Sequence, residues 1–499
     1  MEDSLNKRYI IKLIANLVNG IINMIMVAIV PKALGPIAYG QFIYLQQFFA
    51  QSIGFLDAGT STAFFTKLSK NTARINLIKF YFLYSLIVIA IMISFIYILN
   101  NLDYLKYIFP NIPSQYVYLA IGFGFLIWFT TIFIYISDAH ALTVSVESIK
   151  IFHKIISLFL LLFFINYLTF DLVSYFYYWF ISLMMFICFV VYLFIKKNIL
   201  SLEVLSSCLN LKSLIKEFYT FSSPLFVFNI VAIVFGLFDI WLLQKLGGSE
   251  QVGFYGLSYA IAAMCFLFTS AMTPIITREF AKSFENNNIE EMKKLFSKYI
   301  PMLYSIAAYF GLFISFQSEN LLYIFTDEKF KEAYLVLVIM SFYPIHQTYG
   351  QLSGSIFYVT DQTKIIRNIG IISTLFGFLL TIVLIYYLEL EALGLAWKMI
   401  IIQIISVNIQ LYFNSKYLDL KFAKFVFHQI YSVLFFVIIA YLTNFIMLPF
   451  ENKLIEFLVS GVIYTIFTII SVLIIPSIFG LNRDIVLGMK KYLVKQKVK

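Results

Sequence analysis

The sequence predicts an all-α integral membrane protein of about 14 transmembrane helices, in two six-helix lobes plus two extra C-terminal helices. Three observations predict this class. Hydrophobic residues make up 61% of the 499-residue chain and charged residues only 12%. The hydrophobic residues gather in long apolar stretches. The lysines and arginines between these stretches alternate in density from gap to gap. A soluble domain of this length has no interior for so much apolar surface, whereas lipid solvates it.

Each apolar stretch is long enough to be a membrane-crossing helix. About 20 apolar residues cross the hydrocarbon as a helix, because lipid offers no partner to backbone hydrogen-bonding groups. Most gaps between the stretches are short and polar. The predicted spans are residues 10–31, 41–66, 76–99, 115–137, 151–168, 172–195, 220–245, 252–277, 299–316, 333–359, 365–388, 392–415, 422–447 and 454–478.

The distribution of basic residues predicts the orientation. Alternate gaps, together with the two chain ends, hold 29 lysines and arginines, while the other gaps hold six. The positive-inside rule places the richer side, and with it both termini, in the cytoplasm. The formal charge of +10 is mostly this asymmetry, so it predicts no nucleic-acid partner. The basic tail 490–499 is expected to contact anionic membrane lipids.

No chemistry-bearing motif is present. The sequence contains no CxxC, HExxH, Walker or Rossmann pattern, and its four histidines are scattered. Cys188 and Cys265 lie in predicted spans and Cys208 in a cytoplasmic gap, so no disulfide is expected. We therefore predict no catalytic residue, no metal and no cofactor, and we expect the chain not to be an enzyme.

Two landmarks indicate an internal repeat. The segment 34–42 follows the first predicted span and resembles 246–255 after the seventh, with Gly40 and Gly253 at equivalent places. Residues 107–109 and 323–325 both read Tyr-Ile-Phe at nearly the same offset. A repeat of six spans is even, so both copies point the same way, related by a pseudo-two-fold along the membrane normal.

The repeat divides the chain into four parts. Residues 1–195 form the N-lobe and residues 220–416 the C-lobe. Residues 196–219 are a cytoplasmic linker, in which apolar and charged residues alternate as in an interfacial helix. Residues 417–499 hold spans thirteen and fourteen and the basic tail. Transporters built from such repeats place the substrate between the lobes and rock them for alternating access.

The ordered set of short motifs resembles one superfamily of exporters over almost the whole chain. The motifs are Leu34-Gly35-Pro36 to Tyr39-Gly40, Gly54 to Gly59, Asp239, Leu246 to Tyr255, Ile324 to Ala333 and Leu393 to Ala396. The chain resembles the multidrug/oligosaccharidyl-lipid/polysaccharide (MOP) exporters, and within them the polysaccharide transport family of Wzx-type O-antigen or capsule repeat-unit flippases.

The resemblance implies a function. The cargo would be an undecaprenyl-diphosphate-linked oligosaccharide, moved from the cytoplasmic to the periplasmic leaflet of a bacterial inner membrane. A polysaccharide polymerase and a chain-length regulator would be its partners. No ATP-binding motif is present, so the energy would come from a proton or sodium gradient or from removal of the product.

Three charged residues lie well inside predicted spans, away from the span ends, where a charge costs roughly 2.5–3.5 kcal/mol. Asp57 lies roughly 15 Å deep by helix rise; it either lines the path, balances a charge or couples a proton, or it holds spans together. Asp239 lies closer to the periplasmic edge and either serves the path or caps a helix. Lys398 either contacts the diphosphate or extends to the interface.

The remaining candidates lie at the mouths and along polar faces. Lys67 and Arg278, at the cytoplasmic ends of spans two and eight, either capture the diphosphate or anchor the helices. His346 either titrates or is a packed core histidine. A polar stripe on span one, with a glutamine of span two, either lines a hydrophilic path or joins helices; it comprises Asn16, Asn19, Asn23 and Gln47.

Other functions remain open from the sequence. Another cargo of the same superfamily is one: lipid II, a teichoic-acid precursor or a drug. Span one lacks an acidic residue, which disfavours drug export. A membrane-embedded polysaccharide polymerase or glycosyltransferase is another, disfavoured because the longest outside loop, 317–332, is short and has no His or Arg.

Overall fold

The computed structural model describes residues 5–57, 59–72, 74–200, 210–266, 269 and 272–480. Within these ranges the side chains of 5–13, 15–17, 62, 221–232 and 274 are outside the description. The chain forms two compact units, Met1–Gly253 and Phe254–Lys499, each of which is treated by itself.

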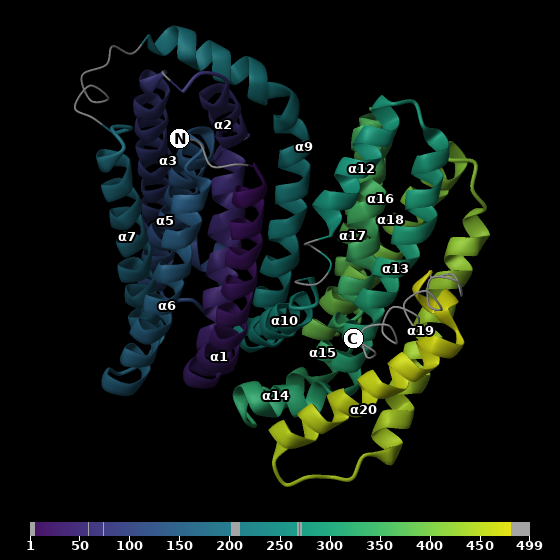
Figure 1. The fold of residues 1–499 in the computed structure, drawn as a ribbon. Helices are drawn as coiled ribbons and strands as arrows, with labels where there is room; N and C mark the ends of the chain where they lie inside the picture. Colours follow the sequence, from purple (N-terminus) through teal and green to yellow (C-terminus); the bar gives the residue numbers. More distant parts are fainter. Residues whose placement is uncertain are drawn as a thin grey trace, which may run out of the picture. The chain divides into compact units, whose positions relative to one another are not determined.

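Unit 1 is a bundle of long helices (Figure 1). Helix α1 packs against α5, α6 and α9, and α5 and α6 both pack against α7. The helices are α1 (Leu5–Asp57), α2 (Thr60–Lys70), α3 (Ile75–Asn101), the short α4 (Leu105–Ile108), α5 (Ser114–Ala139), α6 (Thr143–Tyr167), α7 (Leu172–Lys196), α9 (Leu211–Leu246) and α10 (Gly248–Ala263), the last of which continues into unit 2.

Unit 2 is a second bundle, built around α13. Helix α13 packs against α16 and α19, and α18 packs against α16 and α17. The helices are α12 (Thr273–Glu285), α13 (Ile289–Phe316), α14 (Ser318–Thr326), α15 (Tyr334–Met340), α16 (Tyr343–Val359), α17 (Thr363–Thr381), α18 (Glu391–Tyr417), α19 (Phe422–Ile446) and α20 (Lys453–Ile474), with single turns at Lys331–Ala333 and Pro476–Phe479 and a π-helical turn at Ile382–Tyr387 after α17.

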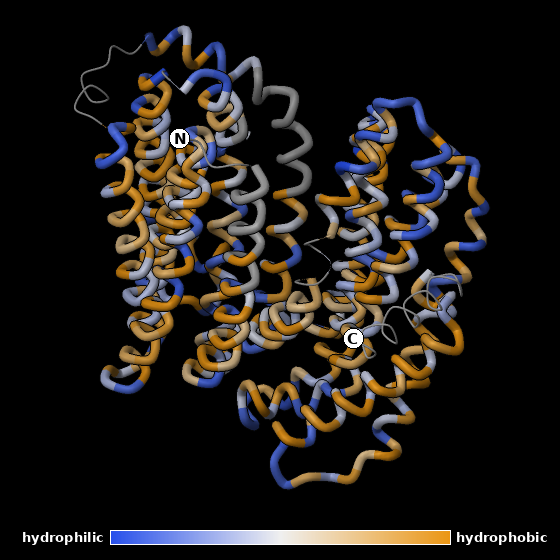
Figure 2. The backbone as a smooth tube through the Cα atoms, viewed as in Figure 1, coloured by the Kyte–Doolittle hydropathy of each residue, from blue (hydrophilic) through white to orange (hydrophobic). Residues whose placement is uncertain are grey.

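The structure confirms the predicted class of an all-helical membrane protein. Within the described ranges, ten helices are long and apolar enough to cross a membrane. Large apolar side chains face outward along them, for example Phe445 at 79% exposure. Figure 2 shows hydrophobic residues along the helices and hydrophilic ones gathered at the turns. Such an exterior requires lipid as its solvent.

Several spans predicted as separate or continuous helices differ in the structure. Spans one and two are two helices that meet at Gly35 inside α1, without the predicted polar gap 32–40 between them. The φ of 78° and ψ of 170° at Gly35 are not helical, and such a φ suits a residue without a Cβ. The predicted span 252–277 is interrupted between α10 and α12, and 333–359 between α15 and α16. A proline within the first two positions of α12 and of α16 explains both restarts, since proline is well placed at a helix start but not inside a helix.

The end of the predicted linker 196–219 forms the first turns of helix α9. Helix α9 begins at Leu211 and runs unbroken into predicted span seven. Asn210 caps it by accepting a hydrogen bond from the backbone N–H of Ser213 at 3.2 Å. The first turns are amphipathic, because Leu214 and Phe218 are buried while most residues beside them are exposed. The packing thus groups this segment with unit 1, and the division into symmetric lobes stays a prediction.

Candidate functional site

Asp57 lies at a break in the predicted second span. Helix α1 ends at Asp57 and α2 begins at Thr60. Asp57 Oδ1 accepts hydrogen bonds from Thr60 Oγ1 at 2.7 Å and from both Ser61 N and Ser61 Oγ, at 2.9 and 2.8 Å. The carboxylate therefore caps the start of α2, where backbone N–H groups have no partner within the helix.

Aromatic side chains from α3 and α5 complete the surroundings of the break. The hydroxyl of Tyr81 donates to Asp57 Oδ1 at 2.8 Å, and Trp128 Nε1 donates to Ser61 Oγ at 3.2 Å. Tyr84 donates to the carbonyl of Leu56, one of the acceptors that the helix break leaves open. These bonds satisfy backbone groups that lipid cannot. We call Asp57, Thr60, Ser61, Tyr81 and Trp128 the Asp57 cluster.

The two oxygens of the Asp57 carboxylate differ. All the hydrogen bonds that the described residues make to this carboxylate go to Oδ1. The side chain is half-buried. Oδ1 is thus committed to the fold, while Oδ2 can accept a bond from a hydroxyl, an ammonium group or a cation.

A second charged group lies where α2 ends and α9 begins. Arg74 binds the Glu217 carboxylate through two bonds, NH1 to Oε1 at 3.0 Å and NH2 to Oε2 at 2.9 Å. Lys67 Nζ lies 2.9 Å from Glu217 Oε1. We call these three residues the Glu217 cluster. The hydrogen bonds from Arg74, supported by Lys67, lower the pKa of Glu217 from 4.5 to about 2.

The Glu217 cluster carries more positive than negative charge. Two cationic side chains share one carboxylate, and 17% of the Lys67 side chain and 33% of the Arg74 side chain remain exposed. Both side chains thus keep some exposed surface. A guanidinium and an ammonium group suit a phosphate in particular.

Phe218 connects the two clusters. It follows Glu217 directly, and its ring packs against Phe80 and Tyr81 with centroids 5.1 and 6.1 Å away. Tyr81 in turn stacks on Phe64 of α2 at 4.5 Å. The first turns of α9 therefore touch the side chain that binds Asp57.

The other candidates in unit 1 have different surroundings. Asn19 has a buried Oδ1 without a hydrogen-bond partner among the described residues, whereas the exposed Asn23 accepts from Lys154 at 3.2 Å. The side chain of Asn16 lies outside the described residues. Gln47 and Asp239 are half-buried on α1 and α9. Asn19 and Asn23 thus share a helix but not an environment.

Unit 2 holds the remaining three candidates at separate places. Arg278 is exposed on α12, Lys398 is half-buried on α18 with its Cε near Gly377, and His346 is 6% exposed on α16. The ring of His346 meets that of Tyr304 at 5.7 Å.

Sequence reasoning missed three partners of the candidates. Tyr81, Trp128 and Glu217 were not selected, because tyrosines are abundant in this chain and Glu217 belongs to a linker. One signal was available: a buried carboxylate needs donors, and a cluster of cytoplasmic cations needs a counter-charge.

Parts of the chain match known proteins in sequence. Residues 224–386 match the MatE family model. The chain is 23% identical over 201 residues to the probable low-salt glycan biosynthesis flippase Agl15 of Haloferax volcanii. That match covers 39% of this chain and 42% of the relative, so it spans less than half of the relative's length.

Solved structures share the fold over nearly the whole chain. The lipid II flippase MurJ, in an inward closed conformation, aligns with a TM-score of 0.69 at 13% identity, covering 93% of this chain and 98% of the other. An inward-facing multidrug resistance MATE family transporter of the MOP superfamily aligns with a TM-score of 0.63 at 14% identity, covering 84% and 95%. The family match covers residues 224–386, and over nearly the whole chain the fold is the one seen in these transporter structures.

Proposed function

We propose that this transporter of the MOP superfamily is a flippase for lipid-linked oligosaccharides, specifically undecaprenyl-diphosphate-linked O-antigen or capsule repeat units. Two comparisons support a flippase: the matched archaeal relative is named for glycan biosynthesis, and the MurJ structure is named for lipid II. The resemblance of the motifs to Wzx-type flippases supports the finer assignment.

The observation that carries this proposal is the surplus positive charge of the Glu217 cluster. A diphosphate is a compact anion, and Arg74 and Lys67 already hold a carboxylate in the geometry that a phosphate would adopt. The positive-inside rule places this end of unit 1 on the cytoplasmic face, where the loaded carrier would enter. An arriving diphosphate would compete with the Glu217 carboxylate for Arg74 and Lys67.

The Asp57 cluster suits the step after entry, in which the head group crosses the membrane. Broken helices form substrate and ion sites in transporters, because the break exposes polar groups at membrane depth. Oδ2 of Asp57 would accept either a sugar hydroxyl or the coupling ion, a proton or sodium. Alternating access by rocking of the two lobes would then expose the head group to the periplasm while the polyprenyl chain stays in lipid.

The proposal includes a location and partners. The protein would lie in the bacterial inner membrane with both termini in the cytoplasm. A polysaccharide polymerase and a chain-length regulator would use the delivered units. Asn16, Asn19, Asn23, Gln47, Asp239, Arg278, His346 and Lys398 stay proposed path residues.

A sidedness assay tests the function. Lipid-linked oligosaccharides are extracted from a deletion strain, and their leaflet is determined from the accessibility of the sugar to an impermeant reagent. We expect complete repeat units on the cytoplasmic leaflet and loss of surface polysaccharide, both restored by the wild-type protein. Normal surface polysaccharide without a trapped intermediate contradicts the proposal. Trapped lipid II, a trapped teichoic-acid precursor or drug sensitivity would each identify another cargo.

A further inference from the structure

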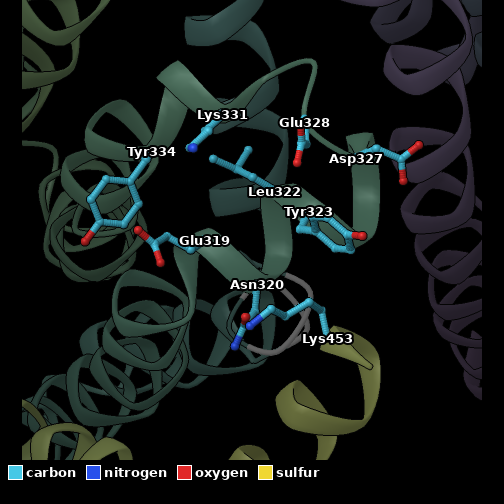
Figure 3. Close-up of a pocket in the computed structure, with 9 residues that line it drawn as sticks. All are labelled: Glu319, Asn320, Leu322, Tyr323, Asp327, Glu328, Lys331, Tyr334 and Lys453. Atoms are coloured by element: carbon cyan, nitrogen blue, oxygen red, sulfur yellow. The ribbon is translucent and has the colours of Figure 1, made fainter. Parts of the chain in front are cut away.

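Unit 2 contains a pocket lined by charged, amide and aromatic side chains, far along the chain from the two clusters. It has a volume of about 430 Å³, within the usual range for small-molecule sites. Helix α14, the turn after it and the starts of α15 and α20 form its walls (Figure 3). Its lining residues are Glu319, Asn320, Leu322, Tyr323, Asp327, Glu328, Lys331, Tyr334 and Lys453. Except for Tyr334, these residues belong to the predicted gaps 317–332 and 448–453, which the positive-inside rule places on the periplasmic side.

The lining mixes acceptor groups with aromatic rings. Tyr323 and Tyr334 are 48% and 37% exposed, so both rings offer apolar surface. In Figure 3, Tyr334 and Glu319 lie on one side of the pocket and Tyr323 and Asp327 on the other. Three carboxylates, those of Glu319, Asp327 and Glu328, line the same space.

This mixture matches the surface of a sugar ring. Hydroxyl groups donate to carboxylate oxygens, which can only accept, and the C–H face of a pyranose packs on a tyrosine ring. The three carboxylates repel anionic lipid head groups. Within the described residues, no group of three or more His, Cys, Asp or Glu side chains is arranged to hold a metal ion. A hydroxyl-rich neutral ligand fits these facts better than a lipid phosphate or a metal.

The α20 side of the pocket is fixed by hydrogen bonds. Asn320 Nδ2 donates to Gln317 Oε1 and to Glu456 Oε1, both at 2.9 Å. Lys453 Nζ donates to Glu456 Oε2 at 3.1 Å. Glu456 thus joins α14 to α20 and holds Asn320 and Lys453 in place, so little ordering is left for a ligand to impose.

The space for a ligand is larger than one sugar ring needs. A second cavity of about 380 Å³ shares four lining residues with the first: Glu319, Asn320, Tyr334 and Lys453. Its lining also includes the amide side chains of Gln317 and Asn444. The two cavities together provide room for two neighbouring sugar units.

We propose that this pocket is an exit subsite that binds neutral or N-acetylated sugar rings of the head group on the periplasmic side. The identity of the ligand as part of the cargo rests on the proposed flippase function. Because carboxylates outnumber amines in the lining, the subsite discriminates against uronic acids.

Direct sugar binding tests the subsite independently of transport. Full-length protein in nanodiscs is titrated with N,N′-diacetylchitobiose, maltose and glucuronic acid and followed by ligand-observed saturation-transfer NMR. We expect signals for the two neutral disaccharides, at least about tenfold weaker binding by the Glu319→Gln/Glu328→Gln double variant, and little signal for glucuronic acid. The matched control is Glu290→Gln, an exposed carboxylate of α13 that lines neither cavity.

A second pair of variants keeps the test valid if the double variant does not fold. Asp327 has φ 55°, a conformation that glycine adopts without strain. Asp327→Gly therefore removes the carboxylate and keeps the turn, and Tyr323→Leu removes an exposed ring; each should weaken binding severalfold. Absence of any neutral-sugar signal, or binding unchanged in all pocket variants, overturns the proposal. Sugar binding without trapped lipid-linked glycan in the deletion strain would instead support the subsite and reject the flippase.

Discussion

The hydroxyl of Tyr81 donates to Asp57 at 2.8 Å, to the same carboxylate oxygen that caps helix α2. The ring of Tyr81 is held between Phe64 of α2 and Phe218 of α9. The Asp57 carboxylate is therefore oriented by three helices before a ligand arrives. Such preorganisation reduces the entropy that a ligand must overcome on binding.

Asp57→Asn should reduce translocation without unfolding the protein. The amide oxygen of asparagine can accept the same bonds as Oδ1, so the cap on α2 persists, but the negative charge at the second position is lost. We expect translocation of lipid-linked oligosaccharide to fall at least about tenfold, with the midpoint of thermal unfolding little changed.

Tyr81→Phe is the matched control, because it removes one donor and leaves the charge. It should lower the free energy of unfolding by about 1 kcal/mol and keep most of the transport. Unchanged export by Asp57→Asn, measured as surface polysaccharide in the complemented deletion strain, would show that Asp57 is only a helix cap.

The Glu217 cluster should make the stability of the protein depend on pH in the acidic range. The pKa of Glu217 is about 2 in the folded protein against 4.5 for a free glutamate. A depressed folded-state pKa gives stability above the unfolded value, and this stability is lost as the pH falls. We expect the thermal midpoint to decline between pH 4.5 and about 2, and the decline to be smaller in Glu217→Gln.

Glu290→Gln serves as the comparison for this titration. Glu290 also pairs with a lysine, Lys293 at 2.9 Å, but its side chain is 74% exposed, so solvent weakens the pair. The control should follow the wild-type curve. A Glu217→Gln curve with the wild-type slope would mean that other carboxylates cause the acid sensitivity.

Much of the fold could be predicted from the sequence, because lipid restricts a spanning chain to few structures. Apolar length and basic residues in alternate gaps were enough for the helical membrane class. The breaks were harder to predict. The predicted span 41–66 runs past Asp57, and the break between Asp57 and Thr60 depends on tertiary partners such as Tyr84, which binds the carbonyl of Leu56.

The candidate site was only partly predictable. Asp57 stood out as a charge within an apolar run, and Lys67 as a cation at its mouth. Their partners come from elsewhere in the sequence: Tyr81 is 24 residues from Asp57, and Glu217 is 150 residues from Lys67. A single sequence gives no information on such pairings, because any of many tyrosines or glutamates would satisfy the same chemistry.

Phe218 should anchor the first turns of α9 on unit 1. Its side chain is 5% exposed, whereas the next residue, Tyr219, is 72% exposed. Phe218→Ala should cost about 3 kcal/mol in the free energy of unfolding, since it removes a buried ring. Tyr219→Ala should change stability by less than about 0.5 kcal/mol.

Limited proteolysis between residues 196 and 219, read alongside thermal unfolding, measures this anchoring. Faster cleavage of Phe218→Ala, with Tyr219→Ala like the wild type, is the expected pattern. Equal effects of both variants would mean that α9 is held by its later turns alone.

The two glycines of the repeat should be the least replaceable glycines of unit 1, because their helices meet there. A Cβ on Gly40 would lie 1.6 Å from the carbonyl oxygen of Ser249, and one on Gly253 would lie 2.3 Å from that of Pro36. Gly54, in the same helix α1, has room, with Ile233 4.0 Å away. Backbone atoms cannot move aside as a flexible side chain can, so Gly40→Ala and Gly253→Ala should each cost about 3 kcal/mol, while Gly54→Ala should be neutral. Thermal unfolding of the three variants in one detergent decides this, and a Gly40→Ala midpoint equal to that of Gly54→Ala would show that the two repeat motifs do not pack closely.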